Sequence, residues 1–198
     1  MLDFESRPKR AKKPTPILIV CEDSASMFFY LRHKAESLGL LDQMPYPVHV
    51  EHDESAPISV VNYALRQSET HNKKATKNRT YLYEEVYCVM DVDEHQTLHK
   101  AIDKLRTHNQ NRTDCEFYSI VSNECAEVWF YLHFDYTTAA LYRPESHKGD
   151  PQHELDKLLT KYLGQRYEKG NRNVYALLQG YSSNERKAIK GAKKLVTV

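Results

Sequence analysis

The sequence predicts an α/β fold in which helices cover both sides of a mainly parallel β-sheet. Short apolar runs that suit buried strands alternate with longer stretches in which apolar residues recur every three or four positions, as on one face of a helix. Acidic or amide side chains follow several of the strand-like runs. Because ligands of parallel sheets bind where the strands end, this pattern also predicts the position of a site.

Length and composition favour a single domain without a membrane span. A chain of 198 residues can bury a substantial core, and its formal charge of +1 means that attraction for an anionic partner must come from local basic patches. The 4 cysteines lack Cys-x-x-Cys spacing and mostly lie in apolar runs, which indicates a reducing, cytoplasmic compartment. No apolar run approaches the roughly 20 residues that cross a bilayer.

The first elements are predicted to be a basic arm, a strand and a helix. Residues 1–13 are polar and basic and show no periodicity, which is typical of a flexible arm. The apolar run 16–21 predicts a strand buried on both faces, and it ends at Glu22. Apolar residues at helical spacing follow from Met27 until Gly39, where a helix stop is expected.

The next stretch predicts a second strand and a short helix. Alternating apolar residues indicate a strand within 45–51, and Pro57 introduces a helix over 58–65. Residues 67–78 are charged and nearly free of apolar side chains. We therefore expect an exposed loop or a frayed helix end there.

The strand predicted at Tyr87–Asp93 is the centre of the chain, because apolar residues run directly into the pair Asp91-x-Asp93. Strand side chains alternate, so both carboxylates project on the same side of the sheet. Two close carboxylates repel each other unless a divalent cation neutralises them, and oxygen ligands favour a hard ion such as Mg²⁺. The alternative is that the two acids only end the strand and cap the following helix.

The remaining elements complete the alternation. A helix is predicted at 98–105, a strand at 114–122 that ends near Asn123, and an apolar helix at 125–134 with the single acid Glu127 near its start. Glu127 either belongs to the site or is an ordinary first-turn acid. Three more helices, expected to pack on the sheet, are centred on 155–163, 174–178 and 188–195.

Three strings of residues in this order resemble the RloB-like family. They are Ile19–Glu22, Met90–His95 and Ser122–Phe134. The resemblance implies a Toprim-like nuclease fold, in which the first-strand Glu and the Asp-x-Asp pair act with Mg²⁺ or Mn²⁺ on a phosphodiester. The family occurs in bacterial defence loci, often beside an ABC-type or OLD-like ATPase.

The chain departs from the family pattern just after the first strand. Asp23 stands where the family has Gly, and Ser26 and Met27 stand near the position of a second family acid. Glycine permits a positive φ and close approach of the backbone to phosphate, whereas Asp brings another negative charge. Asp23 is expected either to cap the following helix or to join the metal ligands.

These observations predict a set of site residues and three parts of the chain. We expect 1–13 to be the basic arm, 14–145 the Toprim-like catalytic domain and 146–198 a helical extension packed on it. The catalytic candidates are Glu22, Asp91, Asp93, Glu127 and His95, of which Glu22, Asp91 and Asp93 are the metal candidates. The candidates for binding nucleic acid are Lys12, Lys13, Lys73, Lys74, Asn123, Lys190 and Lys193.

The leading functional hypothesis is a Mg²⁺-dependent nuclease that hydrolyses RNA, including tRNA, or DNA in an anti-phage defence system. Two alternatives share the fold: a non-catalytic interaction or nucleic-acid-binding module that partners an ATPase, and a phosphohydrolase of small phosphates. The expected partners are nucleic acid and a separately encoded ATPase, and a homo-oligomer is left open.

Overall fold

The computed structural model describes residues 15–22, 26–41, 48–52, 56–92, 97–111, 114–123, 125–136, 151–180 and 184–195. The strands are β1 (Ile17–Cys21), β2 (Val48–His52), β3 (Glu85–Val92) and β4 (Glu116–Asn123). The helices are α1 (Ser26–Ser37), α2 (Pro57–Asn78), α3 (Leu98–Asn111), α4 (Glu127–Tyr131), α5 (Pro151–Leu163), α6 (Val174–Gln179) and α7 (Glu185–Leu195).

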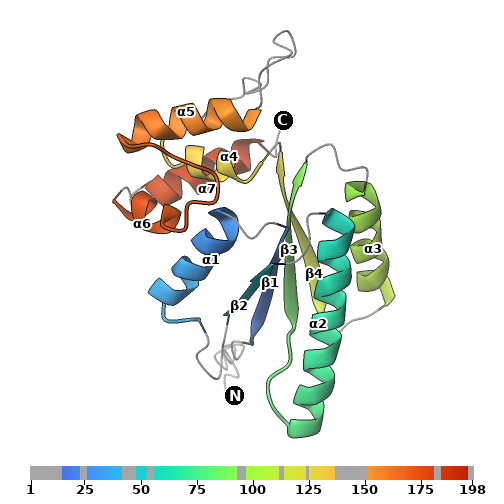
Figure 1. Cartoon of the computed structure of the whole chain (residues 1–198). Coiled ribbons are helices and arrows are strands. Elements are labelled where there is room, and N and C mark those ends of the chain that lie inside the picture. Colours follow the sequence, from blue (N-terminus) through green and yellow to red (C-terminus); the bar gives the residue numbers. More distant parts are fainter. Residues whose placement is uncertain are drawn as a thin grey trace, which may run out of the picture.

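The strands form a four-stranded sheet in the order β2-β1-β3-β4, and every pairing is parallel. The predicted α/β class is therefore confirmed, and Figure 1 shows helices on both sides of the sheet. β1 and β3 lie in the middle, which explains why their runs are apolar on both faces. Cys21 pairs with Val89, so β1 ends beside the second half of β3.

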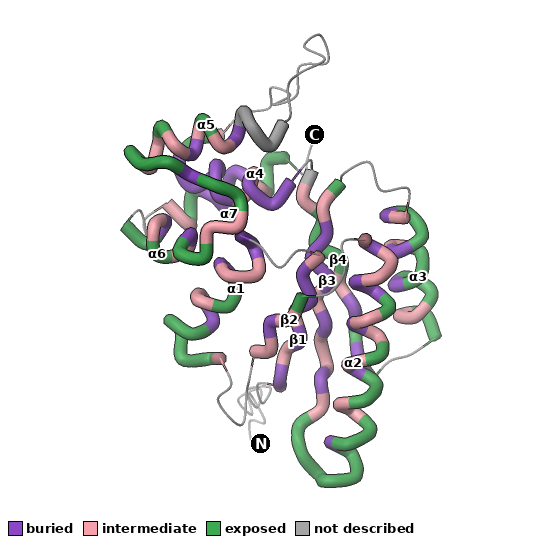
Figure 2. Tube along the Cα trace, in the orientation of Figure 1, coloured by how far each residue is buried: buried purple, intermediate pink, exposed green. Residues whose placement is uncertain are grey.

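Two apolar clusters hold the layers together, one on each face of the sheet. On one face, buried residues of β1 and β3, including Leu18 and Met90, pack with Val60 and Val61 of α2 and with α3. On the other face, Cys21 and Val89 share a cluster with α1 and the C-terminal helices. Figure 2 shows buried segments in the strands and at intervals along the helices that cover them.

The prediction of a loop or frayed end at residues 67–78 is wrong, because α2 continues to Asn78. The buried face of the helix continues through this stretch, but small or polar residues form it. Ser68 and Ala75 are buried, and the ring of His71 stacks on Tyr83 with 4.0 Å between centroids. The helix ends at Arg79, which adopts the left-handed conformation with φ 53°.

Two asparagine side chains bind the backbone at the starts of β3 and β4. Asn72 of α2 accepts from Tyr83 N at 2.8 Å and donates to Tyr83 O at 3.0 Å. Asn109 of α3 accepts from Phe117 N at 3.0 Å and donates to Phe117 O at 2.8 Å. A carboxamide therefore supplies the donor and acceptor that a neighbouring strand would provide.

The C-terminal helices gather with α4 and α1 (Figure 1). α5 and α7 pack against α4, and α6 packs against α1, so the expectation that they lie directly on the sheet is corrected. α4 is also shorter than predicted: it spans Glu127–Tyr131, and Leu132–Phe134 form a turn. In the close contact of α7 with this turn, a Cβ added to Gly191 would lie 3.0 Å from Leu132 Cδ2.

None of the helices in the described part of the chain is both long and apolar enough to cross a bilayer.

Candidate functional site

Glu22 and Asp91 meet at the carboxyl edge of the sheet. The Oε2 atom of Glu22 accepts a hydrogen bond from the backbone N–H of Asp91 at 2.9 Å, and Glu22 N donates to Val89 O at 2.9 Å. Both residues are half-buried, so solvent and ligands reach them. The structure therefore brings together two of the predicted metal ligands, which lie 69 positions apart in the sequence.

The strand register explains this meeting. Cys21 pairs with Val89, and Glu22 is the next residue, so its side chain arrives where β3 presents Met90 and Asp91. Strand side chains alternate, so Asp91 lies on the same face as Val89, whose neighbours include α1 and the C-terminal helices. This is the face on which α4 begins.

Glu127 is the first residue of α4 and is only 1% exposed. Its Oε1 lies 3.2 Å from the hydroxyl of Tyr167, and among the described residues no Lys, Arg or His forms an ion pair with it. Burial of a carboxylate without a cation is costly. A side chain with this environment is unusual for an ordinary first-turn acid, and this favours a site role.

The thiol of Cys125 connects Glu127 with the carboxylate of Asp91. Burial, followed by the negative charge of Glu127 and that of Asp91, raises the pKa of the Cys125 thiol well above its usual range. The thiol is therefore protonated and is not a nucleophile. The negative charges of both carboxylates therefore reach the Cys125 thiol.

Sequence reasoning missed two polar residues of this region, Ser26 and Tyr167. The sequence places Ser26 only near the position of a second family acid, yet Ser26 is fully buried and its Oγ lies 3.0 Å from the Tyr167 hydroxyl. The backbone N–H of Gly170 also donates to Ser26 Oγ at 2.8 Å. Nothing in the local pattern singles out Tyr167 among 14 tyrosines, because its partners are more than 35 positions away.

Several predicted site residues lie outside the part of the chain that the structure describes. They are Asp23, Asp93, His95, Lys12 and Lys13. Asn123 ends β4 opposite Val92, so its backbone lies at the carboxyl edge beside the end of β3. His133, which the sequence places in the apolar helix predicted at 125–134, is 3% exposed, and its Nδ1 lies 3.0 Å from the carbonyl oxygen of Trp129.

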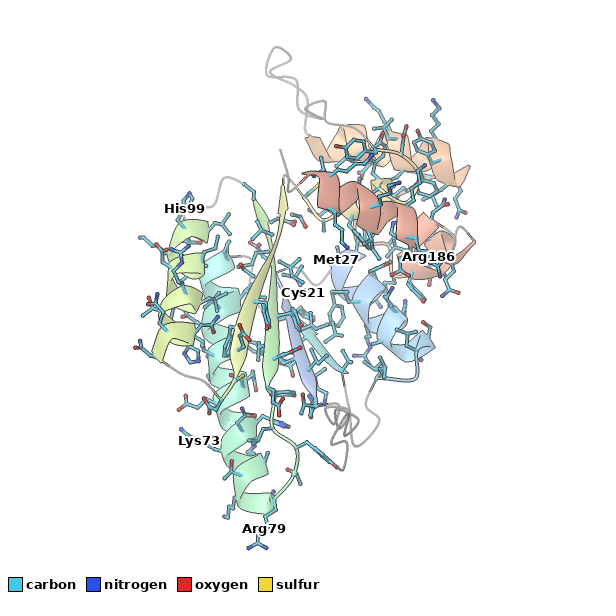
Figure 3. All side chains as sticks on the ribbon, turned by 180° about the vertical axis from the view of Figure 1, so that it is seen from behind. Cys21, Met27, Lys73, Arg79, His99 and Arg186 are labelled. Atoms are coloured by element: carbon cyan, nitrogen blue, oxygen red, sulfur yellow. The ribbon has the colours of Figure 1, made fainter. Side chains whose placement is uncertain are left out.

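The predicted basic residues divide into two regions. Lys190 and Lys193 are exposed on α7. Lys73 and Lys74 lie on the distal half of α2, and Figure 3 shows Lys73 at the end of the molecule away from Cys21 and Arg186. Lys73 is also paired with Glu69 at 2.8 Å. The structure therefore does not bring Lys73 and Lys74 to the carboxylates.

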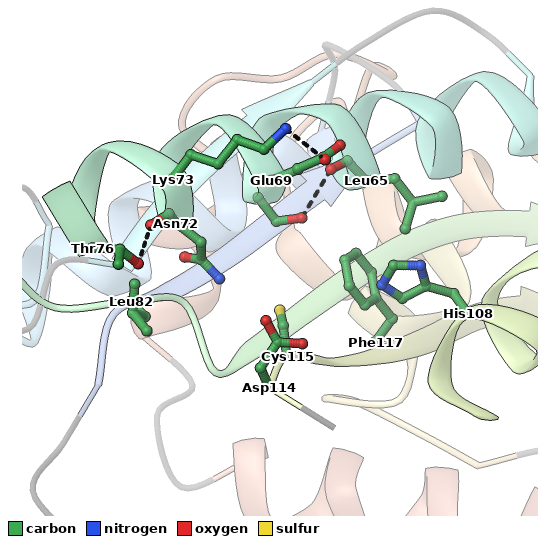
Figure 4. A pocket seen from close by; sticks show the side chains of 11 residues that line it. Leu65, Glu69, Asn72, Lys73, Thr76, Leu82, His108, Asp114, Cys115 and Phe117 are labelled. Carbon is green, nitrogen blue, oxygen red and sulfur yellow. Dashed lines mark hydrogen bonds and ion pairs between the residues drawn. The ribbon is translucent and has the colours of Figure 1, made fainter. Parts of the chain in front are cut away.

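A cavity of about 570 Å³ lies between α2, the end of α3 and the start of β4. Figure 4 shows its polar lining, which includes Asn72, Lys73, His108 and Asp114. These residues lie at the amino end of the sheet, because Asn72 binds Tyr83 just before β3. The cavity is separate from the carboxylates of Glu22 and Asp91.

The donor chemistry of the carboxyl edge fits a magnesium ion. Mg²⁺ is held in proteins by one or two carboxylates together with water and substrate phosphates. Glu22 and Asp91 provide two carboxylates, and Glu127 is a buried carboxylate without a described cation partner. Within the described ranges no three His, Cys, Asp or Glu side chains form a group that could hold a metal ion, so an ion at this edge would be held by fewer protein ligands together with water and substrate oxygens.

Comparison with known proteins gives one match. A family model described as RloB-like protein matches residues 17–198, which is nearly the whole chain. No curated protein and no solved structure matches the chain.

Proposed function

The chain belongs to the RloB-like family, and from this premise we propose that it is a Mg²⁺-dependent nuclease. Its substrate would be RNA, with tRNA as a candidate, or DNA, and it would act as the effector of an anti-phage defence system with a separate ATPase. The observation that carries the proposal is the meeting of Glu22 and Asp91 at the carboxyl edge, where the Glu22 carboxylate is held 2.9 Å from the Asp91 amide.

The carboxylates would hold the ion, and Mn²⁺ would serve in its place. Bound Mg²⁺ supplies charge neutralisation for the scissile phosphate and lowers the pKa of an attacking water. Glu22 is restrained, because its Oε2 accepts the Asp91 N–H, and its carboxylate would serve as a ligand of the ion or accept a proton from water. The exposed Lys190 and Lys193 would contact backbone phosphates of the nucleic acid.

The proposal is tested by incubating the purified protein with labelled tRNA, mRNA and plasmid in Mg²⁺, Mn²⁺ or EDTA. We expect cleavage that requires the metal and that falls at least about 100-fold in Asp91→Asn, since even partners outside the ligand shell are worth 10–100-fold. Glu22→Gln should retain the hydrogen bond to Asp91 N, because an amide oxygen also accepts, yet it should lose metal-dependent cleavage.

The matched control is Asp103→Asn. Asp103 is an exposed acid on α3 that is paired with Arg106 at 3.1 Å, so its loss should leave cleavage unchanged. Normal cleavage by Asp91→Asn would overturn the site. Absence of any cleavage by the wild-type protein would favour a non-catalytic interaction module, and turnover of mononucleotides alone would favour a small-phosphate phosphohydrolase.

A further inference from the structure

The buried acid Glu127 is connected to the C-terminal helices by a chain of hydrogen-bonding groups. Gly170 N donates to Ser26 Oγ at 2.8 Å, Ser26 Oγ lies 3.0 Å from the Tyr167 hydroxyl, and that hydroxyl lies 3.2 Å from Glu127 Oε1. Tyr167 is 3% exposed, and its own backbone N–H donates to Thr160 Oγ1 at 2.9 Å. The group is therefore shielded from water and fixed at both ends.

The number of available protons sets the direction of these bonds. A carboxylate can only accept, and the phenol has a single proton, so Tyr167 satisfies Glu127 only by donating to it. Ser26 already accepts from Gly170 N, and its own proton is then free to point at the Tyr167 oxygen. Each donor in such a chain polarises the next, which strengthens the final bond to the carboxylate.

The phenol is well suited to remain a donor. Burial, and then the charge of Glu127, raise the pKa of the Tyr167 hydroxyl far above its ordinary value. The hydroxyl lies 3.2 Å from Oε1 of Glu127, and the Cys125 thiol is hydrogen-bonded to the same side chain and also experiences the charge of Asp91.

We propose that Tyr167 is a positioning residue of the carboxylate site: through its hydroxyl, the segment Tyr167–Gly170 of the C-terminal region fixes Glu127 for metal binding beside Asp91. This inference rests on the proposed function, because the metal is what Glu127 is positioned for. It also makes the C-terminal region part of the site, since Tyr167 contacts both Glu127 and Ser26 and Gly170 N donates to Ser26.

The experiment compares Tyr167→Phe with Tyr162→Phe. The first change removes one hydroxyl and keeps the buried ring. The control removes a hydroxyl that donates to another carboxylate, Asp135 Oδ2, at 3.0 Å on the exposed side of α5. Binding of Mg²⁺ alone and of Mn²⁺ alone is measured by isothermal titration, and circular dichroism checks the fold.

We expect Tyr167→Phe to raise the Kd for the metal 10- to 100-fold, the range found for partners that orient a ligand, while Tyr162→Phe leaves it unchanged. In cleavage assays at saturating metal, activity of Tyr167→Phe should recover, because the lost interaction acts through metal affinity. A Kd equal to that of Tyr162→Phe would overturn the positioning role.

Ser26→Ala provides a second, independent test. Because Ser26 acts on Glu127 only through Tyr167, the double variant with Tyr167→Phe should bind metal no more weakly than Tyr167→Phe alone. Additive losses of metal affinity in the double variant would contradict an action of Ser26 through Tyr167. The proposed function fails separately: if wild-type protein bound no metal, or if Asp91→Asn bound it normally, both proposals would fall, whereas normal binding by Tyr167→Phe alone removes only this one.

Discussion

Glu127 and His133 are buried polar side chains, and the hydrogen-bond partner of each determines how it behaves. Glu127 depends on Tyr167, whereas His133 depends on its own turn, where its Nδ1 lies 3.0 Å from Trp129 O. A carbonyl oxygen accepts only, so His133 carries its proton on Nδ1. Its ring also contacts the edges of Tyr30 and Trp129.

His133 predicts a pH dependence of stability. Burial lowers the pKa of His133 below its ordinary value, and the nearby charge of Lys34 acts in the same direction. As the pH falls through about 6.5, His133 binds a proton in the unfolded chain but stays neutral in the folded chain. The free energy of unfolding therefore decreases. The contribution is fully present above that pH and is lost as the pH falls toward the lowered pKa.

We therefore expect His133→Asn to flatten the decrease in the free energy of unfolding between about pH 7 and pH 5, because Asn does not titrate and its amide can donate to Trp129 O. Urea denaturation across this range measures the effect. His99→Asn, at an exposed position on α3, serves as the control. Parallel curves for wild type and His133→Asn would show that His133 does not contribute.

At the scale of the elements, the helices do more than cover the sheet. α2 and α3 each place an asparagine against the backbone just before or at the start of the following strand. Residues along a strand alternate in the side to which their backbone groups point, so Asn109 satisfies a pair of Phe117 groups that β3 does not bind. The helix thereby sets where the edge strand β4 begins.

Asn109→Ala should lower the free energy of unfolding by about 1–3 kcal/mol, because it leaves a part-buried N–H and C=O of Phe117 without partners. Asn111→Ala is the matched control on the same helix, since its amide only donates to Thr107 O at an exposed position. Hydrogen exchange of the Phe117 amide should accelerate only in the first variant. Equal stability of the two variants would contradict the role of Asn109.

At the scale of the whole molecule, the candidate metal ligands and the candidate phosphate contacts lie on different elements. The carboxylates lie at the carboxyl edge of the sheet, and α7 carries Lys190 and Lys193 on its exposed surface. Two neighbouring basic residues contact other groups: Lys187 donates to Phe134 O, and Lys194 lies 5.0 Å over the ring of Tyr136. Lys190 and Lys193, both exposed, are the residues of α7 that the sequence predicts to contact phosphate.

If the protein binds nucleic acid as proposed, Lys190→Ala with Lys193→Ala should weaken binding and reduce the slope of log K against log salt. Two lost phosphate contacts reduce it by about 1.8 for duplex DNA and about 1.4 for a single strand. Lys73→Ala with Lys74→Ala, at the far end of α2, should leave the slope unchanged. The reverse result would place the nucleic acid at the amino end of the sheet.

The sequence by itself determined the fold class and the position of Glu22 and Asp91 at the same edge of the sheet. Apolar runs that end in acids predict parallel strands, and the carboxyl ends of parallel strands necessarily share an edge. Apolar periodicity did not predict the helix at residues 67–78. The buried residues of α2 there include Ser68 and Ala75, which are too small or too polar to produce an apolar pattern.

Only the tertiary structure decided which residues surround these acids. The order β2-β1-β3-β4 makes β1 and β3 neighbours, and this adjacency brings Glu22 to the Asp91 amide. Tyr167 reaches Ser26 across 141 positions and Glu127 across 40. No local pattern encodes such contacts, because they depend on how the C-terminal helices pack on α1 and α4, and that packing is a property of the whole buried core.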